Sequence, residues 1–204
     1  GQFERFRSDP EDSYAISSDR VLVLFEDSSG ELWIGTYGGG LNRLDGGTGG
    51  FQRYPGEPGR PDGLSGDEIY MITEAAGGDL WVAAKGAGLN RWRYEDRVNG
   101  RLSVTRYTTT DGLPSNTIYS GAWDSGGRLW MSTNRGLTRL DAETGQFNNY
   151  DTSHGLQDDE FNLSAEQVAE RLGEDRSTVA NYLRLLDLPD EVKSWVAEDK
   201  LAMG

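Results

Sequence analysis

The sequence predicts a mostly β structure followed by a small α-helical part. Three observations predict it: a tryptophan-centred segment recurs three times, 28 glycines are spread among aromatic residues, and the spacing of apolar residues changes after Asn162. Glycine at this frequency between aromatic residues indicates many tight turns rather than low complexity. Apolar residues alternate before the change and recur every three to four positions after it, so strands are expected first and helices second.

The recurring segments are ELWIGTYGGGLNRLD, DLWVAAKGAGLNRW and RLWMSTNRGLTRLD. Their tryptophans, Trp33, Trp81 and Trp130, are 48 and 49 residues apart. Repeats of roughly 20 to 50 residues are typical of architectures in which each repeat is one supersecondary unit. Because every repeat has strand-like content throughout, each is predicted to be one four-stranded antiparallel blade.

Runs of β-branched and aromatic residues between glycine-rich turns place four strands in each repeat. In the first repeat the strands are expected at residues 21–26, 32–36, 41–45 and 51–54. In the second they are expected at 68–73, 80–84, 89–92 and, after a longer hairpin, 104–107. In the third they are expected at 117–123, 129–133, 137–141 and 147–150. The blades should therefore span residues 16–54, 64–107 and 113–150, with no helix between residues 20 and 150.

Where D-x-x-G-x-L-W, G-x-G-L-x-R-L-D and T-G-x-F-x-x-Y recur together, residues 1–161 resemble the blade repeats of two-component regulator propellers. The resemblance implies sensor blades of membrane histidine kinases, which often face the periplasm and detect small molecules, frequently carbohydrate fragments. A small-molecule ligand of the propeller is therefore one expected partner. Residues 3–6 match the last strand of a preceding blade and residues 154–161 the start of a following one. We thus expect a partial β-propeller that self-associates through its open blade edges.

Individual residues of the repeats favour structural roles. The tryptophans have a fixed place in each repeat, so packing between blades is favoured over stacking on a ligand. Gly38–Gly40 is predicted to be a turn rather than a phosphate cradle, because neither a helix nor a P-loop lysine follows it. Asp27, Glu31 and Asp124 lack the ligand spacing of a calcium loop and are expected to be solvated or to cap turns.

The composition leaves little room for catalysis. The chain has no cysteine, and its one histidine, His154, has no second histidine or cysteine with which to share a metal ion. The carboxylates of the repeats lie at turns rather than in a paired acid and base. We therefore predict a non-enzymatic protein with no catalytic residue, no metal site and no cofactor.

Charge and hydropathy limit the compartment and the partners. No stretch approaches the roughly 20 apolar residues that cross a bilayer, and the opening residues GQFERFRSDP contain no apolar signal core. The chain as it stands is expected to be cytoplasmic, although the propeller family is often periplasmic. Its net charge of −14 is shared by both parts, which argues against strong nonspecific binding of nucleic acid.

Residues 162–204 are predicted to form a helix-turn-helix of about three helices. Ser164 opens a capping-box pattern, SAEQ, and the first helix should end near Gly173. Asp175 is a suitable N-cap for a second helix over residues 176–186, and a third helix follows. On the second helix the apolar residues fall in one sector and the small and polar residues lie opposite them, where they can enter a major groove.

Residues 163–204 strongly resemble the helix-turn-helix of ParB-type chromosome-partitioning proteins, especially in VAERLG, RSTVANYLRLL and LP. The resemblance implies recognition of double-stranded DNA at a short palindromic, centromere-like site. The residues expected to contact DNA are Gln167, Arg176, Ser177, Thr178, Asn181 and Arg184. Glu174 stands in the inter-helix turn, where many family members carry lysine, so weak binding is expected. The family's nucleotide-binding and dimerisation regions are not among these residues, so closure of a clamp is not expected.

Three functions remain open on the sequence alone. The chain is a ligand-sensing propeller with a DNA-binding output, a DNA-binding module with an inert propeller, or a chimeric or truncated chain without a joint function. We favour a chimeric or truncated origin, because the two families work in different compartments and the joint at DDEFNLS has no linker. The favoured function is non-enzymatic recognition, and the alternative is a ligand-sensing propeller of a two-component system with no functional DNA binding.

Overall fold

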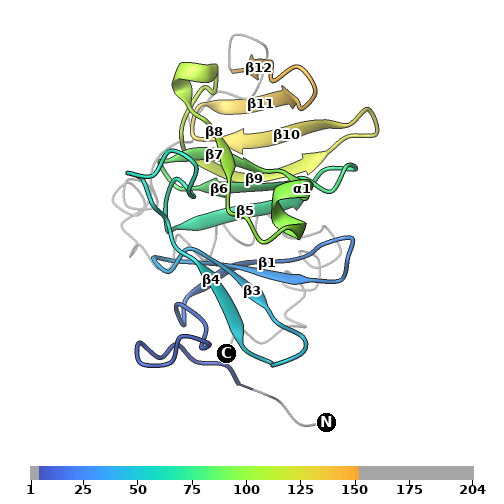
Figure 1. The fold of residues 1–204 in the computed structure, drawn as a ribbon. Helices are drawn as coiled ribbons and strands as arrows, with labels where there is room; N and C mark the ends of the chain where they lie inside the picture. The colour runs from blue at the N-terminus through green and yellow to red at the C-terminus, as the bar shows by residue number, and fades with distance from the viewer. Residues whose placement is uncertain (1–4, 152–204) are drawn as a thin grey trace, which may run out of the picture. The chain divides into compact units, whose positions relative to one another are not determined.

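The computed structural model describes residues 5–151, which form three four-stranded antiparallel sheets (Figure 1). The chain divides into two units, Gly1–Leu156 and Gln157–Gly204, and all described residues belong to the first. In each sheet, strands that are consecutive in the sequence are hydrogen-bonded neighbours. The predicted mostly β part is therefore confirmed, whereas the predicted helix-turn-helix of residues 162–204 lies outside the described residues.

The strands begin and end within one residue of the expected positions. The first blade contains β1 (Val21–Glu26), β2 (Leu32–Thr36), β3 (Leu41–Leu44) and β4 (Phe51–Tyr54). The second blade contains β5 (Ile69–Glu74), β6 (Leu80–Ala84), β7 (Gly88–Trp92) and β8 (Val104–Tyr107). The third blade contains β9 (Ile118–Trp123), β10 (Arg128–Thr133), β11 (Gly136–Asp141) and β12 (Phe147–Tyr150).

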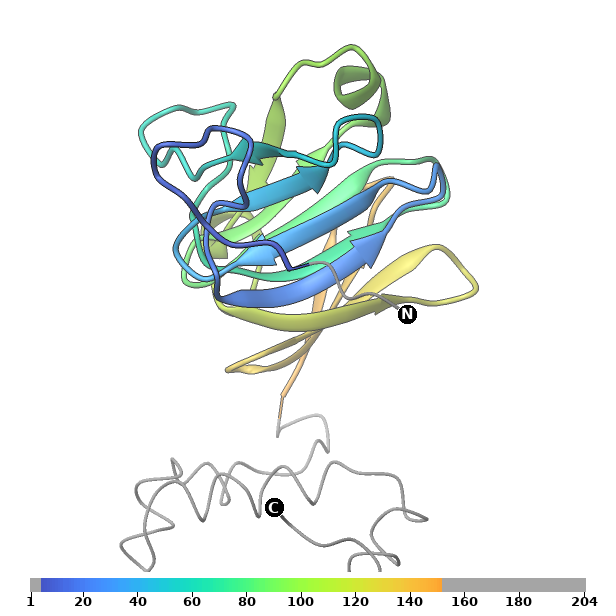
Figure 2. The same cartoon turned by 90° about the horizontal axis from the view of Figure 1, so that it is seen from below.

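The blades are arranged radially. Strand β5 contacts β1 on one side and β9 on the other, so the first strands of the three blades lie next to one another (Figures 1 and 2). The last strands, β4, β8 and β12, form the opposite edge of each sheet. First strands around a common axis and last strands at the outside are the arrangement of blades in a β-propeller.

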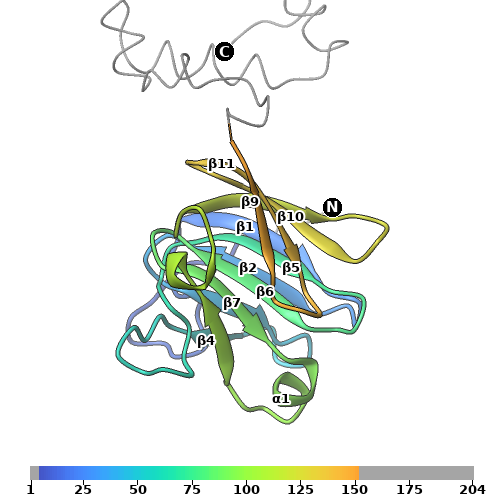
Figure 3. The same ribbon diagram turned by 90° about the horizontal axis from the view of Figure 1, so that it is seen from above.

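The expectation of no helix between residues 20 and 150 was wrong in two connections. Helix α1 (Tyr94–Val98) lies in the long connection between β7 and β8, and one 3-10 turn, Thr109–Asp111, precedes the third blade (Figure 3). Thr108 caps that turn in a reciprocal capping box with Asp111. Both helices lie in loops, so the strand pairing is unaffected. No helix of the described residues is long and apolar enough to span a membrane.

Apolar side chains fill the spaces between neighbouring blades. The cluster between the first and second blades includes Trp33, Leu41, Leu64, Ile69, Ile72, Leu80, Val82 and Trp92. The cluster between the second and third blades includes Met71, Trp81, Leu89, Leu113, Ile118, Leu129, Met131 and Leu140. Trp33 and Trp81 are 0% and 1% exposed, which confirms that these tryptophans pack between blades.

A polar side chain in the last strand of each blade holds the loop that leads into that blade. Arg53 donates to backbone carbonyls within residues 9–15, and Arg106 donates to carbonyls within residues 57–64. In the third blade, Asn149 donates to one such carbonyl. These bonds give hydrogen-bonding partners to irregular backbone that forms no sheet.

A buried ionic cluster joins the first blade to the second. Arg97 of α1 donates to Oδ2 of Asp27 in the first blade and, at 3.2 Å, to Oε1 of Glu74 in the second. The side chains of Arg97, Asp27 and Glu74 are only 3%, 0% and 8% exposed. Burial raises the pKa of Asp27, but hydrogen bonds from Trp33, Arg97 and nearby backbone amides outweigh it and hold that pKa below its usual value. The two buried carboxylates therefore share Arg97 as their cation.

Replacing Arg97 with alanine should lower the free energy of unfolding by about 3–5 kcal/mol, because two buried carboxylates lose their cation. The matched control is Arg101→Ala in the same connection, where the arginine side chain is 71% exposed in an ion pair with Asp96. That change should cost only about 0–1 kcal/mol. Urea denaturation followed by tryptophan fluorescence measures both, and equal losses in the two variants would contradict the assignment.

Candidate functional site

A stack of tryptophan, arginine and tyrosine recurs on the same side of each blade. The three stacks are Trp33–Arg43–Tyr54, Trp81–Arg91–Tyr107 and Trp130–Arg139–Tyr150. The guanidinium lies 5.3–5.9 Å from the centre of the tryptophan ring. The centres of the tyrosine and tryptophan rings are 5.4–5.9 Å apart. The first two stacks are covered by the next blade, whereas Trp130 of the third is only half-buried.

The arginine of the stack has an acidic partner in two of the blades. Glu31 binds Arg43 at 3.0 Å, and Asp79 binds Arg91 at 2.7 Å. Both acids stand two residues before the tryptophan of their blade. Arg128 occupies this position in the third blade, so the acid that pairs with the other two arginines is missing beside Arg139.

An aspartate in the turn before the second strand binds the tryptophan indole in the first and third blades. Oδ2 of Asp27 accepts from Nε1 of Trp33, and Oδ2 of Asp124 accepts from Nε1 of Trp130, both at 2.9 Å. The other oxygen of each aspartate accepts two backbone amides of its turn. These bonds confirm the turn-capping role, and the bond from Trp130 is the main cause that lowers the pKa of Asp124 to about 2.

The second blade lacks this link. Ala75 stands where the other blades have aspartate, and Nε1 of the buried Trp81 has no hydrogen-bond partner within residues 5–151. The turn itself is unchanged, because Ala75 donates to the Asp79 carbonyl at 2.9 Å and accepts from the Gly78 amide at 2.8 Å. Comparing EDSSGELW with EAAGGDLW reveals the substitution in the sequence, but its consequence for Trp81 was not predicted.

A row of cations and tyrosines, which we call the rim row, crosses all three blades. It consists of Arg20, Tyr37, Lys85, Tyr70 and Tyr119. The Arg20 guanidinium lies 3.7 Å from the ring centre of Tyr37, and the Lys85 ammonium lies 6.0 and 5.7 Å from those of Tyr37 and Tyr70. Tyr70 in turn stacks on Tyr119 at 6.2 Å. Such a row offers aromatic faces and positive charge to a ligand.

The glycine turn beside the rim row is held by backbone hydrogen bonds. Gly38 and Gly40 have φ values of +82° and +75°, and both amides donate to the Asp67 carbonyl, at 3.1 and 2.9 Å. The predicted turn is therefore confirmed, and these two amides are already used by the backbone. Lys85 forms an ion pair with Glu68 at 3.2 Å, so part of the positive charge of the row is already balanced.

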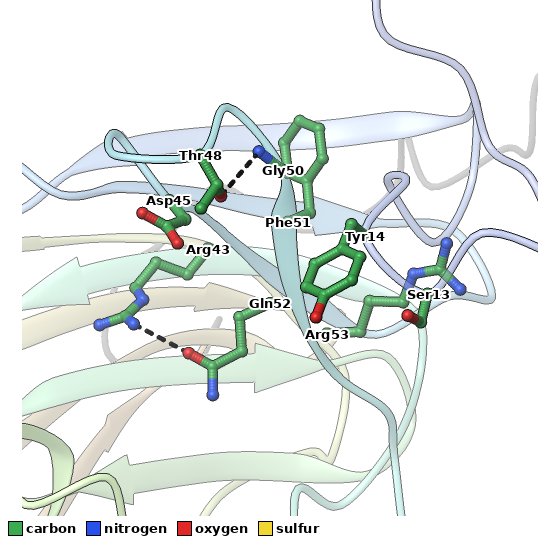
Figure 4. Close-up of a pocket in the computed structure, with 9 residues that line it drawn as sticks. All are labelled: Ser13, Tyr14, Arg43, Asp45, Thr48, Gly50, Phe51, Gln52 and Arg53. Atoms are coloured by element: carbon green, nitrogen blue, oxygen red, sulfur yellow. Dashed lines mark hydrogen bonds between the residues drawn. The ribbon is translucent and has the colours of Figure 1, made fainter.

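A hollow of about 540 Å³ lies on the first blade beside β4 (Figure 4). It is lined by Ser13, Tyr14, Arg43, Asp45, Thr48, Gly50, Phe51, Gln52 and Arg53. Its volume suits a small molecule. However, its polar groups bind one another: Arg43 donates to Gln52 at 2.8 Å, and Thr48 accepts from the Gly50 amide at 3.3 Å. These two bonds occupy part of the polar lining of the hollow.

The residues predicted to contact DNA lie outside the described residues, and so does His154. They are Gln167, Arg176, Ser177, Thr178, Asn181 and Arg184. Within residues 5–151, no three carboxylate or imidazole groups gather as a metal ion needs. The described part of the chain therefore offers the three stacks, the rim row and the hollow on the first blade.

Two family models match the chain. Residues 148–204 match the ParB HTH domain, and residues 15–38 match the two component regulator propeller. The chain is 61% identical over 46 residues to the chromosome-partitioning protein ParB of Myxococcus xanthus. The matched stretch covers 22% of this chain and 16% of that protein. It is 49% identical over 44 residues to stage 0 sporulation protein J of Bacillus subtilis, again 22% and 16% of the two chains.

Solved structures resemble the propeller part. The extracellular domain of a proposed hybrid two-component system from B. thetaiotaomicron has a TM-score of 0.60 and 26% identity, covering 72% of this chain and 19% of that one. The extracellular domain of a proposed one-component system from the same organism has a TM-score of 0.62 and 22% identity, covering 73% and 20%. The chain thus spans about a fifth or less of each relative, and the second likeness shows the fold alone.

Replacing Ala75 with aspartate should raise the free energy of unfolding by about 0.5–1.5 kcal/mol, because the carboxylate supplies the missing acceptor for Nε1 of Trp81. In a Trp81→Phe background the same substitution should give no gain, since phenylalanine has no N–H group. Urea denaturation of the four chains measures the difference. A gain of the same size in both backgrounds would show that the indole is not the group that benefits.

Proposed function

We propose that this chain is a non-enzymatic recognition protein in which sensor-type propeller blades are joined to a ParB-type DNA-binding segment. The match of residues 148–204 to the ParB HTH domain carries the proposal. The chemistry of the described blades supports recognition rather than catalysis. Asp27 and Asp124 cap turns and bind indoles, while Glu31 and Asp79 neutralise arginines. None of these four carboxylates is left to act as an acid or a base.

A chimeric or truncated origin is supported by the place of the joint. The ParB match begins at residue 148, inside β12, so no linker separates it from the third blade. The propeller relatives are extracellular domains, whereas the ParB relatives partition chromosomes. Two such parts would work in different compartments. Sequencing source DNA across the codons for DDEFNLS tests this origin, and an unbroken genomic reading frame would contradict an assembled chimera.

The predicted DNA contacts stand at the start of the second expected helix of the C-terminal segment. Arg176 and Asn181 are residue types that pair with base edges in the major groove, and Ser177 and Thr178 can bind bases or phosphates. Glu174 precedes them in the expected turn and places negative charge near the DNA backbone. Binding should therefore be specific but weak, and it should be detected at low salt.

Fluorescence anisotropy with two labelled duplexes tests DNA recognition by the whole chain. A duplex with a ParB-type palindrome should bind more tightly than a scrambled duplex at low salt. Arg176→Ala should weaken binding of the palindrome by about 1–3 kcal/mol, because a base or phosphate contact is lost. Glu174→Lys should strengthen binding of both duplexes about equally, since a charge beside the backbone reads no base.

The matched control for Arg176→Ala is Arg101→Ala, which removes the same charge from an exposed site in the second blade. This control should leave the affinity for both duplexes unchanged. Equal binding of the palindrome and the scrambled duplex, or equal effects of the two arginine changes, would contradict sequence-specific recognition.

The alternative is a ligand-sensing propeller without functional DNA binding. It corresponds to the outcome in which neither duplex binds at low salt. The observation that favours it is the rim row, because tyrosines from all three blades lie together with cations from the first two. Calorimetric titration with neutral and acidic oligosaccharides checks this alternative. Tyr119→Ala should then abolish binding, while Tyr94→Ala, at an exposed tyrosine of α1 outside both the row and the hollow, should not.

A further inference from the structure

The first and third blades each present one of the two surfaces that pack together wherever two blades are neighbours. The first and third blades lie on opposite sides of the second (Figure 1). We call the side of a blade that carries the Trp–Arg–Tyr stack its forward face, and the opposite side its rear face. The forward faces of the first and second blades are covered by the rear faces of the second and third. The first blade's rear face and the third blade's forward face have no blade of the described residues against them.

On the rear face of the first blade, Ile34 and Phe51 are buried in a small cluster with Ile16, but the apolar side chains of β1 are exposed. Val21 and Leu24 of β1 are 45% and 62% exposed. Ile69 and Ile72, which hold the same positions in β5, are 0% and 5% exposed because the first blade covers them. Strand β1 therefore exposes apolar side chains at positions where β5 buries them against a neighbouring blade.

The forward face of the third blade carries the matching surface. Trp130 is half-buried, although its counterparts in the first two blades are fully buried. In the second stack, Arg91 reaches across the interface and donates to the Ala142 carbonyl of the third blade at 3.3 Å. Arg139 holds the same position on the forward face and lacks the acid that neutralises Arg91. It is therefore placed to donate to a carbonyl of another rear face.

The first and second blades also share a polar contact, and counterparts of its donor and its acceptor lie on the third and first blades. Glu74, the last residue of β5, accepts from the amide and the hydroxyl of Ser28 at 2.7 and 3.1 Å. Glu26 holds the position of Glu74 in the first blade, and Ser125 holds the position of Ser28 in the third. Both are exposed. One open face thus carries the acceptor and the other the donor.

We propose that the forward face of the third blade binds the rear face of the first blade of a second copy of this chain. In this head-to-tail contact Trp130 is covered as Trp33 is, Leu24 packs as Ile72 does, and Ser125 donates to Glu26 of the second copy. A second identical contact closes two copies into a ring of six blades, which lies within the roughly four to eight blades that propellers contain. The contact does not depend on DNA binding.

The N-terminal segment fits the same contact. Phe6 packs edge-on against Phe51 at 5.1 Å, much as Tyr107 packs against Phe147 at 6.0 Å in the next interface. Residues near Phe6 therefore take the place of the last strand of a preceding blade. In the head-to-tail contact the β12 strand of the other copy takes that place, and Phe6 must move away from Phe51.

Sedimentation velocity of the whole chain over a range of concentrations tests the contact. The sedimentation coefficient should rise from that of one chain to that of two. Leu24→Glu should lower the association constant by about tenfold or more, since a buried leucine is replaced by a charge. Val98→Glu is the matched control, because Val98 is 58% exposed and lies in α1, outside both faces. It should leave the association constant unchanged.

A charge exchange identifies the contact as intermolecular. Ser125→Asp should weaken association by placing two carboxylates together, and Glu26→Lys should weaken it by removing the acceptor. The double variant should restore association, because residues 26 and 125 lie in different blades and can meet only between copies. A concentration-independent monomer would overturn the proposal. So would association that Leu24→Glu and Val98→Glu alter equally, or that the double variant fails to restore.

Discussion

The structure depends on one constraint: a single sheet has two faces, and each face must be covered by a neighbouring blade. A blade of this size has no apolar interior of its own, so its tryptophan becomes buried only when the next blade packs against it. The stacks follow from this constraint. Across the strands the tryptophan pairs with an arginine whose guanidinium lies over the indole ring, and in the first two blades this guanidinium also binds an acid.

The two inter-blade contacts satisfy the same constraint with different chemistry. Between the first and second blades, Arg97 joins two buried carboxylates, Asp27 and Glu74. Between the second and third blades, Trp123 holds the position of Glu74 and donates to the Thr73 hydroxyl at 3.0 Å. Within residues 5–151 the second contact has no counterpart of the Arg97 cluster, and Ala75 stands at the position of Asp27. The indole N–H of the buried Trp81 consequently has no hydrogen-bond partner within residues 5–151, which costs stability.

The repeats made the strands predictable, because three copies of one pattern fix the same turns at the same spacing. Helix α1 was not predictable in this way, since it lies in an insertion that the other repeats lack. The ionic cluster was even harder to predict from the sequence. Arg97 lies 70 residues from Asp27 and 23 from Glu74, and no sequence pattern links them. The rim row depends in the same way on residues that only the packing of blades brings together. Ala75 is the exception, because aligning the repeats is enough to find it.

The joint between the two sequence families has a physical consequence whatever its origin. The ParB match begins at residue 148, yet β12 ends at Tyr150 and belongs to the sheet of the third blade. Asn149 of this strand accepts from the Thr138 hydroxyl at 2.7 Å and donates to the Gly112 carbonyl at 2.9 Å. It thereby ties β12 both to the neighbouring strand and to the loop that leads into the blade. A chain cut at the start of the ParB match would remove three of the four residues of β12 and uncover β11. Any separation that keeps the third blade intact must therefore fall after Tyr150.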